Sequence, residues 1–395
     1  MPATPLPFCK PEDVGLSSSG LGRLTSALEE RVGRGHVPGA VALVARHGKV
    51  AYFQAFGKQD PVSGAPMTTE SIFRIYSMTK AIVSVGTMML WEEGRLMLGD
   101  PIEKYLPAFA APKVGVVENE TMRLVPAARS ITVQDLLRHT SGLTYEFRGA
   151  TPVHKAYIDA KVARLKQTNE DQVATLAALP LLHQPGAYWE YSRSTDVLGR
   201  LIEVISGQSL GVFLQERICG PLGMTDAGFS VPAKDHGRIA EPFAKDPETS
   251  MDINLLDVKR TALFESGGGG MVSSTMDYAR FCAMLMNNGR LDGVRLLGRK
   301  TLELMTSDHL GAIPSNPELL PPGHGFGLGF AVRTSAGMAP FPGTVGNYYW
   351  GGAAGTTFWV DPGERLYGVL MVQAPVQREH YRLLFRDLVY AAIAD

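Results

Sequence analysis

The chain has 395 residues, enough for two domains or for one large domain that carries an insertion. Its 38 Lys and Arg are balanced by 39 Asp and Glu, so no basic surplus exists to neutralise phosphates, and nucleic acid is excluded as an expected partner. The hydrophobic fraction of 45% predicts a globular protein with a sizeable core. No run of about 18 apolar residues occurs, so we expect no membrane-spanning segment.

The cysteines and the first residues bear on the compartment. Cys9, Cys219 and Cys282 are widely spaced and form no C-x-x-C pair. This pattern disfavours a disulfide framework and a structural zinc site, and it is typical of a reducing compartment. Residues 1–15 lack a basic start followed by an apolar core, so no signal peptide is predicted and we expect a cytoplasmic protein.

The first hundred residues predict a helix, a hairpin and a second helix. In 17–34, apolar residues recur at helical spacing, which predicts an amphipathic helix. Two β-rich runs over 39–57 flank His47-Gly48-Lys49, which is a hairpin signal. Residues 77–94 predict a helix that is apolar on most faces, so we expect it to be buried.

The rest of the chain changes character twice. Helical patterns dominate 101–260, over 132–138, 153–180, 195–206 and 209–218. Beyond a glycine cluster, a helix is predicted over 275–288, strands over 326–333, 344–350, 356–360 and 367–373, and a closing helix over 376–393. Short turns between these strands favour an antiparallel sheet. We therefore predict an α/β plus α fold: a sheet domain from 1–100 and 261–395, flanked by helices, and an inserted helical domain over 101–260.

Ser77-Met78-Thr79-Lys80 is an S-x-x-K motif at the start of the buried helix. Positions i and i+3 share one helix face, so the ammonium group can reach the hydroxyl. The positive end of the helix dipole and burial both oppose the charge, so we expect the pKa of Lys80 to fall and the amine to accept the serine proton. The alternative is a helix-capping Ser77 with a solvated Lys80, which the apolar helix disfavours.

Further segments accompany this motif in order along the chain. They are 73–80 (FRIYSMTK), 136–143 (LLRHTSGL), Pro185-Gly186 followed by Tyr191-Ser192, 221–224 (PLGM), 266–271 (SGGGGM) and 325–329 (GFGLG). Together they resemble class C serine β-lactamases, family VIII carboxylesterases and penicillin-binding proteins over roughly residues 20–390. The resemblance implies the β-lactamase/transpeptidase-like fold, with Ser77 as the nucleophile.

Tyr191 matches the tyrosine of the family's Y-x-N motif, and the resemblance makes it the general base or acid. A phenol has an ordinary pKa near 10, and a neighbouring Lys80 would favour the phenolate. Which of Lys80 and Tyr191 takes the first proton stays open, because the two would titrate as a coupled pair. Arg193 stands where the β-lactamases have asparagine and could equally point to solvent, which speaks against β-lactam recognition.

The β-lactamase K-T-G motif, carried on an edge strand, is matched here by Trp350-Gly351-Gly352, the form seen in family VIII esterases. An indole offers apolar area and one N–H donor, which suits a neutral acyl or alcohol group better than an anion. The strand is expected to place the amide of Ala353 opposite that of Ser77, as an oxyanion hole. Trp350, Gly351, Gly352 and Tyr145 are the expected substrate-binding residues.

Three other features of the sequence are not expected to form a catalytic, metal or phosphate site. Residues 207–211 (GQSLG) match the G-x-S-x-G motif of α/β-hydrolases, but a helical pattern precedes them, so Ser209 is expected to cap a helix. His139 lies in the HTSGL turn and is expected to be structural. The histidines lack metal-ligand spacing, and the glycines of 267–270 lack the G-K-[ST] of a phosphate loop.

These observations predict a cytoplasmic serine carboxylesterase that hydrolyses short-chain acyl esters through an acyl-enzyme on Ser77, without metal or organic cofactor. The expected partner is a small-molecule ester, and the oligomeric state is not predicted. An acyltransferase of the same fold, which passes the acyl group to an alcohol, fits the same residues. A β-lactamase or DD-peptidase is disfavoured by Trp350 and Arg193, and a silent binding protein by the presence of Ser77, Lys80 and Tyr191.

Overall fold

The computed structural model describes residues 5–119 and 121–395. Within them the main sheet has seven strands in the order β2-β1-β13-β12-β11-β10-β9, and each neighbouring pair is antiparallel. The strands are β1 (Gly39–Arg46), β2 (Lys49–Gly57), β9 (His324–Phe326), β10 (Ala331–Arg333), β11 (Tyr348–Gly351), β12 (Thr357–Asp361) and β13 (Leu366–Val372). The predicted antiparallel sheet built from both ends of the chain is confirmed.

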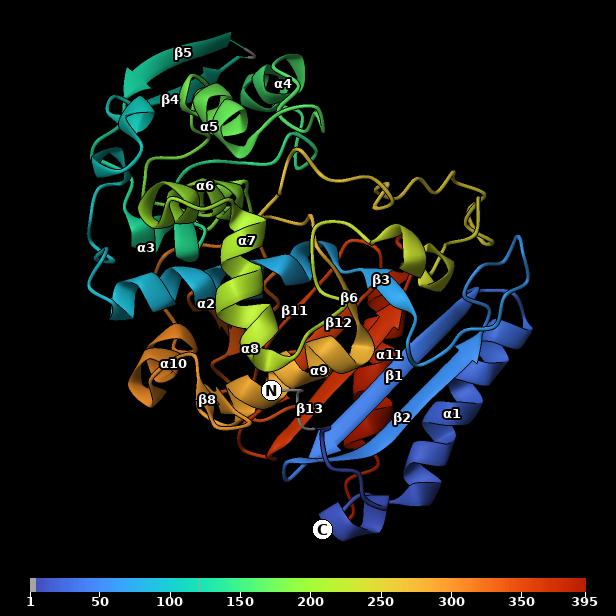
Figure 1. The fold of residues 1–395 in the computed structure, drawn as a ribbon. Coiled ribbons are helices and arrows are strands. Elements are labelled where there is room, and N and C mark those ends of the chain that lie inside the picture. The colour runs from blue at the N-terminus through green and yellow to red at the C-terminus, as the bar shows by residue number, and fades with distance from the viewer. Residues whose placement is uncertain (1–4, 120) are drawn as a thin grey trace.

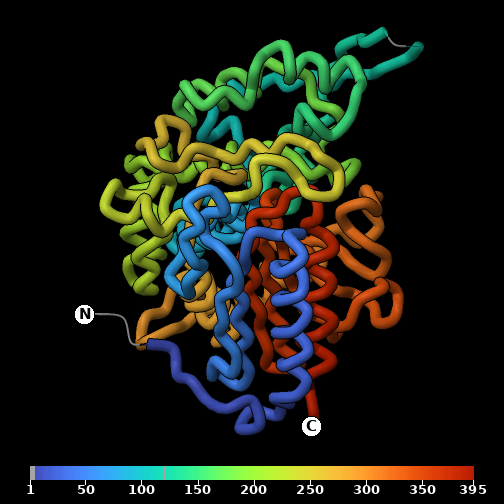
Figure 2. Tube along the Cα trace, turned by 90° about the vertical axis from the view of Figure 1, so that its right-hand side faces the viewer, coloured from blue at the N-terminus to red at the C-terminus, as the bar shows by residue number. Residues whose placement is uncertain are grey.

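Helices cover both faces of this sheet (Figure 1). On one face α1 (Ser18–Gly33) and α11 (Arg378–Tyr390) lie side by side, as Figure 2 shows. On the other face lies α9 (Thr275–Met286), with α2 (Thr79–Glu92) beyond it. Successive side chains of β1 enter the two cores in turn, which is why that strand is apolar throughout.

The middle of the chain supplies a further group of helices, most of which lie beyond α2 in Figure 1, while the last two run past α2 to α9. They are α3 (Val133–Leu137), α4 (Pro152–Asp159), α5 (Asn169–Ala177), α6 (Ser194–Ser206), α7 (Leu210–Leu214) and α8 (Gly220–Leu222), with a π-helical turn over Gln215–Cys219 between the last two. A hairpin of β4 (Lys113–Glu118) and β5 (Thr121–Pro126) lies among them and was not predicted. The domain boundaries near 100 and 260 stay a prediction.

Smaller elements complete the fold. The strand β3 (Ile72–Arg74) pairs with β6 (Val272–Ser274), and β7 (Arg290–Leu291) pairs with β8 (Val294–Arg295). A short helix, α10 (Arg299–Met305), follows. Single 3₁₀ turns are η1 (Pro11–Val14), η2 (Tyr76–Met78), η3 (Ile102–Lys104), η4 (Pro107–Phe109) and η6 (Ala233–Arg238). The β3–β6 pair matters for the site, because it joins the segment that leads into Ser77 to the segment that follows the glycine cluster.

Three predicted elements differ from the structure. The helix expected over 77–94 begins as a 3₁₀ turn, and its α-helical part starts at Thr79. The strand expected over 326–333 is two strands, because the chain turns at Gly329 (φ +102°) against Ser84 of α2, where a Cβ would meet the serine hydroxyl. The helix expected over 153–180 is α4 and α5 with a loop between them.

The predicted edge position of the W-G-G strand is wrong. β11 lies between β10 and β12 in the main sheet. However, β10 pairs only with Tyr348 and Tyr349, so the end of β11 that carries Trp350 and Gly351 extends past it. This end is therefore free to line a cavity although the strand is internal.

Among the described residues, no single helix is long and apolar enough to cross a membrane. Only α6 together with the helical run Leu210–Leu222 reaches the required length and composition, and these two are bent by 81° relative to each other.

Candidate active site

Ser77 lies in the 3₁₀ turn η2, directly before α2. The preceding residue, Tyr76, has a φ of +43°, in the left-handed region that bulky residues seldom adopt. The Tyr76 hydroxyl accepts a hydrogen bond from the amide of Leu256 at 2.8 Å, which holds the turn in place. Such backbone strain is concentrated at functional sites, and here it precedes a serine whose side chain lines a cavity.

Lys80 is almost fully buried, and its Nζ donates to three oxygen atoms. These are the Ser77 hydroxyl at 3.3 Å, the Tyr145 hydroxyl at 2.9 Å and the carbonyl of Gly268. Burial lowers the pKa of Lys80, but the phenols of Tyr145 and Tyr191 outweigh it and raise this pKa above the ordinary value. The predicted fall of the pKa was therefore wrong: burial was anticipated correctly, but the oxygens of Tyr145 and Gly268, which accept two of the three hydrogen bonds, come from distant segments. Lys80 is an ammonium group that donates to Ser77.

Two tyrosines lie against this ammonium group. Nζ of Lys80 is 4.6 Å from the ring centroid of Tyr191 and 5.3 Å from that of Tyr145. Burial raises the pKa of Tyr145 to about 12 despite the nearby Lys80, so this phenol keeps its proton. The hydroxyl of Tyr191 accepts a hydrogen bond from Nε1 of Trp350 at 3.0 Å. The two phenols thus differ: Tyr145 accepts a hydrogen bond from Lys80, and Tyr191 accepts one from Trp350.

Of the predicted substrate-binding residues, Trp350 and Gly351 end β11, Gly352 follows it, and Tyr145 lies in the loop after α3. Trp350, Gly351 and Tyr145 line the same cavity as Ser77 and Ala353, whereas Gly352 is not part of its lining. The N–H of Trp350 donates to the hydroxyl of Tyr191 and is therefore not free to bind a substrate, contrary to expectation. A Cβ on Gly352 would lie 2.3 Å from the carbonyl oxygen of Ile75, so only glycine allows β11 to approach the segment before Ser77. The oxyanion-hole role of the Ser77 and Ala353 amides stays a prediction.

Arg193 does not point to solvent. It is buried, its Nη2 lies 2.6 Å from the Glu146 carboxylate, and its Nη1 lies 3.4 Å from that of Asp196. Its guanidinium carbon is 4.7 Å from the ring centroid of Tyr145. The sequence left the orientation of Arg193 open, because neither of the two carboxylates that pair with it had been identified.

Sequence reasoning missed Asp196 and Gly268 as parts of the site. One carboxylate oxygen of Asp196 accepts the amide of Gly268 at 2.9 Å and the hydroxyl of Ser266 at 2.6 Å. The Gly268 carbonyl in turn accepts from Lys80. The glycine cluster was visible in the sequence, and its close approach to the first turn of α6 explains its composition: a Cβ on Gly267 would lie 2.5 Å from the carbonyl oxygen of Thr195.

The ring of His139 packs against the ring of Tyr191. Its Nδ1 accepts the amide of Ser192 at 3.3 Å, and its ring centroid lies 5.0 Å from that of Tyr191. Burial lowers the pKa of His139 well below its ordinary value, so the ring is neutral. This agrees with the structural role expected for this histidine.

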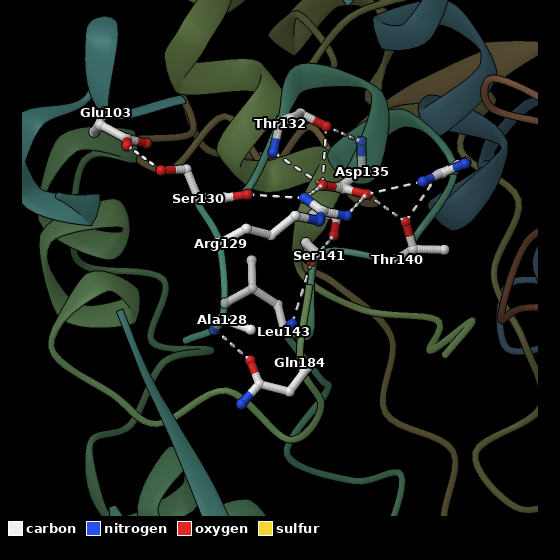
Figure 3. A network of polar contacts seen from close by, with 12 residues as sticks. Glu103, Ala128, Arg129, Ser130, Thr132, Asp135, Thr140, Ser141, Leu143 and Gln184 are labelled. Atoms are coloured by element: carbon white, nitrogen blue, oxygen red, sulfur yellow. Dashed lines mark hydrogen bonds and ion pairs between the residues drawn. The ribbon is translucent and has the colours of Figure 1, made fainter. Parts of the chain in front are cut away.

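The loop that carries Tyr145 is anchored by Asp135 of α3 (Figure 3). The fully buried Asp135 carboxylate accepts from Arg129 at 2.5 and 3.0 Å, from Arg138 at 3.1 Å and from the Thr140 hydroxyl at 2.8 Å. Burial raises the pKa of Asp135, but these donors outweigh it and bring the pKa to about 2. With two further hydrogen bonds from the amide and hydroxyl of Thr132, the carboxylate accepts six in all, so a buried charge fixes the turn that leads to Tyr145.

We expect Asp135→Asn to lower the free energy of unfolding by about 2 kcal/mol at pH 7, because that is what a pKa about two units below its ordinary value implies. A carboxyl whose pKa is lower in the folded state stabilises the fold above its unfolded pKa, near 3.8, and this contribution is lost as the pH falls through about 2. Denaturant titrations from pH 7 down to 2 should show the difference between wild type and variant shrinking. Asp159→Asn, which removes an exposed ion pair with Lys155, is the control and should cost under about 0.5 kcal/mol. Equal losses in the two variants would contradict the assignment.

The prediction that Ser209 caps a helix is confirmed. Ser209 caps α7, with its hydroxyl accepting the amide of Val212 at 3.3 Å, and Gly207 ends α6 in the left-handed conformation with φ of +75°. Across residues 5–119 and 121–395, no cluster of three or more His, Cys, Asp or Glu side chains has an arrangement that could hold a metal ion.

The site opens into a cavity of about 920 Å³. Ser77, Tyr145, Tyr191, Trp350 and Ala353 share its wall. A hydroxyl beside an ammonium group, with two phenols of different surroundings, is an arrangement suited to nucleophilic attack with proton transfer.

Comparison with known proteins agrees with this geometry. A family model described as Beta-lactamase matches residues 24–391. Protein Rv1367c of Mycobacterium tuberculosis (strain ATCC 25618 / H37Rv) is 35% identical over 360 residues, covering 88% of each chain. Esterase EstB of Burkholderia gladioli is 30% identical over 390 residues, covering 93% of this chain and 95% of that one.

A solved structure shows the same architecture. The structure of EstCE1, described as a hydrolase with promiscuous acyltransferase activity, has a TM-score of 0.80 and 28% identity, and the match covers 94% of this chain and 98% of that one. The family match spans the segments that carry Ser77, Lys80, Tyr191 and Trp350. The chain belongs to the β-lactamase family.

Proposed function

We propose that this protein is a serine carboxylesterase that hydrolyses short-chain acyl esters through an acyl-enzyme on Ser77. The observation that carries the proposal is the contact between Trp350 and Tyr191: an indole occupies the motif position where a β-lactamase has a lysine, and its N–H is donated to the phenol. At this motif position the cavity is therefore lined by the aromatic ring of Trp350 and not by the charged side chain of a lysine. The 30% identity to an esterase over nearly the whole chain supports the same assignment.

The contacts suggest how the proton moves. Because Nζ of Lys80 donates to three oxygen atoms, we assign Tyr191, acting as a phenolate, as the group that takes the proton of Ser77; its hydroxyl oxygen accepts the N–H of Trp350, and its ring centroid lies 4.6 Å from Nζ of Lys80. The serine oxygen then attacks the ester carbonyl, and the amides of Ser77 and Ala353 stabilise the resulting oxyanion. The proton passes to the leaving alcohol, and an acyl group remains on Ser77. Water, deprotonated by the same phenolate, releases the carboxylic acid and restores the serine.

A second candidate is acyl transfer to an alcohol. The acyl-enzyme is common to both reactions, and the outcome depends on whether water or an alcohol reaches it first. The cavity of about 920 Å³ leaves room for a second substrate, and EstCE1, at 28% identity, is described with both activities. A β-lactamase is disfavoured, because Trp350 replaces the lysine of the third motif and Arg193, which is paired with Glu146 and Asp196, replaces the asparagine of the second.

One assay separates these functions. A short-chain nitrophenyl ester and a chromogenic cephalosporin are compared with the wild type and Ser77→Ala, with and without a competing alcohol. We expect ester turnover that Ser77→Ala abolishes and that exceeds cephalosporin turnover. A new ester formed from the alcohol would favour the transferase, whereas faster cephalosporin hydrolysis, or ester turnover that survives in Ser77→Ala, would overturn the proposal.

A further inference from the structure

Three large apolar side chains that line the cavity of Ser77 are more than half exposed. Phe147 is 69% exposed, Leu165 55% and Leu263 60%, and each of them lines that cavity. They come from three separate loops: the one after α3, the one between α4 and α5, and the long segment before β6. We call these three residues the apolar rim.

The apolar rim is continuous with the candidate catalytic groups. The ring of Phe147 stacks on that of Tyr145, with centroids 4.8 Å apart and planes 24° apart. The hydroxyl of Tyr145 accepts a hydrogen bond from Lys80, which donates to Ser77 as well. An aromatic surface therefore leads from the nucleophile to the outer edge of the cavity.

Exposure alone is ordinary, since folded proteins leave many single apolar side chains in water. Val62 and Met251 are as exposed as the rim residues, yet neither belongs to the cavity wall. What distinguishes the rim is that three such side chains converge on one concave site, which is where apolar surface marks ligand binding. The size of the cavity points the same way. Cavities of about 300–1,000 Å³ hold drug-sized ligands, and at about 920 Å³ this one exceeds what a short-chain ester alone requires.

We propose that the apolar rim binds an extended apolar group of the substrate, an alkyl chain or ring system in either the acyl or the alcohol half of the ester. This inference rests on the proposed esterase function. An apolar group in the alcohol half narrows the proposed substrate class, whereas one in the acyl half would extend it beyond short-chain acyl esters. The reacting ester lies at Ser77, and the apolar group runs along Tyr145 and Phe147 to contact Leu165 and Leu263. Burying those side chains against the ligand removes apolar area from water, so binding should strengthen with each methylene that reaches the rim.

Two substrate series test this. The first is nitrophenyl esters of lengthening acyl chain, and the second is acetate esters of lengthening alkyl alcohols, both kept below their aggregation concentrations. In one of the two series we expect kcat/KM to rise by about twofold to fourfold per added methylene, mainly through a lower KM, over several methylenes. The series that rises identifies the half of the ester that occupies the rim.

Variants of the rim residues test whether the rise of kcat/KM with chain length depends on the apolar rim. Leu263→Ser and Leu165→Ser should each lower the ratio of kcat/KM for the longest ester to that for the acetate by about fivefold. Val62→Ser, at a still more exposed position outside the cavity, should leave this ratio unchanged.

The failures are distinguishable. If the acetate is turned over but neither series gains with length, or if the rim variants leave the ratio unchanged, the rim proposal is overturned and the esterase proposal stands. If the rim variants instead change the oligomeric state in size-exclusion chromatography without changing the ratio, the rim is an interface between copies and the proposal is likewise overturned. Absence of turnover for every ester would overturn both.

Discussion

Lys80→Met is expected to lower kcat/KM for a short-chain nitrophenyl ester by about 10³-fold or more. Methionine keeps the length and apolar body of the side chain but removes the only ammonium group that donates to Ser77 in the described residues. The loss should appear in kcat as well as in kcat/KM, because the charge stabilises the phenolate and the developing negative charge more than it stabilises bound substrate. Steady-state kinetics, with circular dichroism to establish folding, measure it.

Lys104→Met is the matched control, because Lys104 is exposed and its ammonium group contacts only near neighbours in the chain, Asp100 through a surface ion pair and the ring of Tyr105 at 5.0 Å. It should change kcat/KM by less than about twofold. A folded Lys80→Met enzyme that keeps a tenth or more of wild-type activity would show that the ammonium group is not required. The pH profile adds a second check: since the pKa of Lys80 lies above its ordinary value, activity should show no acid limb from lysine titration near neutral pH.

Tyr191→Phe is expected to lower kcat by about 10²- to 10⁴-fold, the usual contribution of a general base. Its hydroxyl accepts the Trp350 N–H, and its ring lies over the Lys80 ammonium group, so the variant keeps the ring and removes only the proton acceptor. Single-turnover kinetics should place the loss in both acylation and deacylation, because the same phenol serves both steps.

Tyr145→Phe is the internal comparison for this prediction. With a pKa of about 12, Tyr145 keeps its proton and acts by accepting a hydrogen bond from Lys80. Losing one hydrogen bond to a charged group should cost about tenfold to a hundredfold in kcat. If Tyr145→Phe proved more damaging than Tyr191→Phe, the roles of the two phenols would have to be exchanged.

The fold was largely predictable because its elements follow local rules. The hairpin turn at His47-Gly48 (φ +51° and +78°) and the period of apolar residues in α1 depend on nearby residues only. The β4–β5 hairpin was missed because its side chains are mostly exposed and show no alternation of apolar and polar residues. The break at Gly329 was missed because its cause, Ser84 of α2, lies far away in the chain.

In the site, too, features set by nearby residues could be predicted, and features set by distant residues could not. The i, i+3 spacing placed Lys80 beside Ser77, and the ordered motifs brought Tyr191 and Trp350 to the same cavity. The charge of Lys80 could not be predicted, because it depends on oxygens of Tyr145 and Gly268 that approach only in the folded chain. The orientation of Arg193 likewise depends on Glu146, far away in the sequence.

The central claim is that Ser77 carries the acyl group, and rapid-quench mass spectrometry of the enzyme with a nitrophenyl acetate tests it most directly. The claim predicts one acetyl group per chain, on Ser77 after peptide mapping, formed in a burst with nitrophenol release and absent from Ser77→Ala. A burst in which acetyl is found on another residue, such as Ser209, or persists in Ser77→Ala, would contradict it.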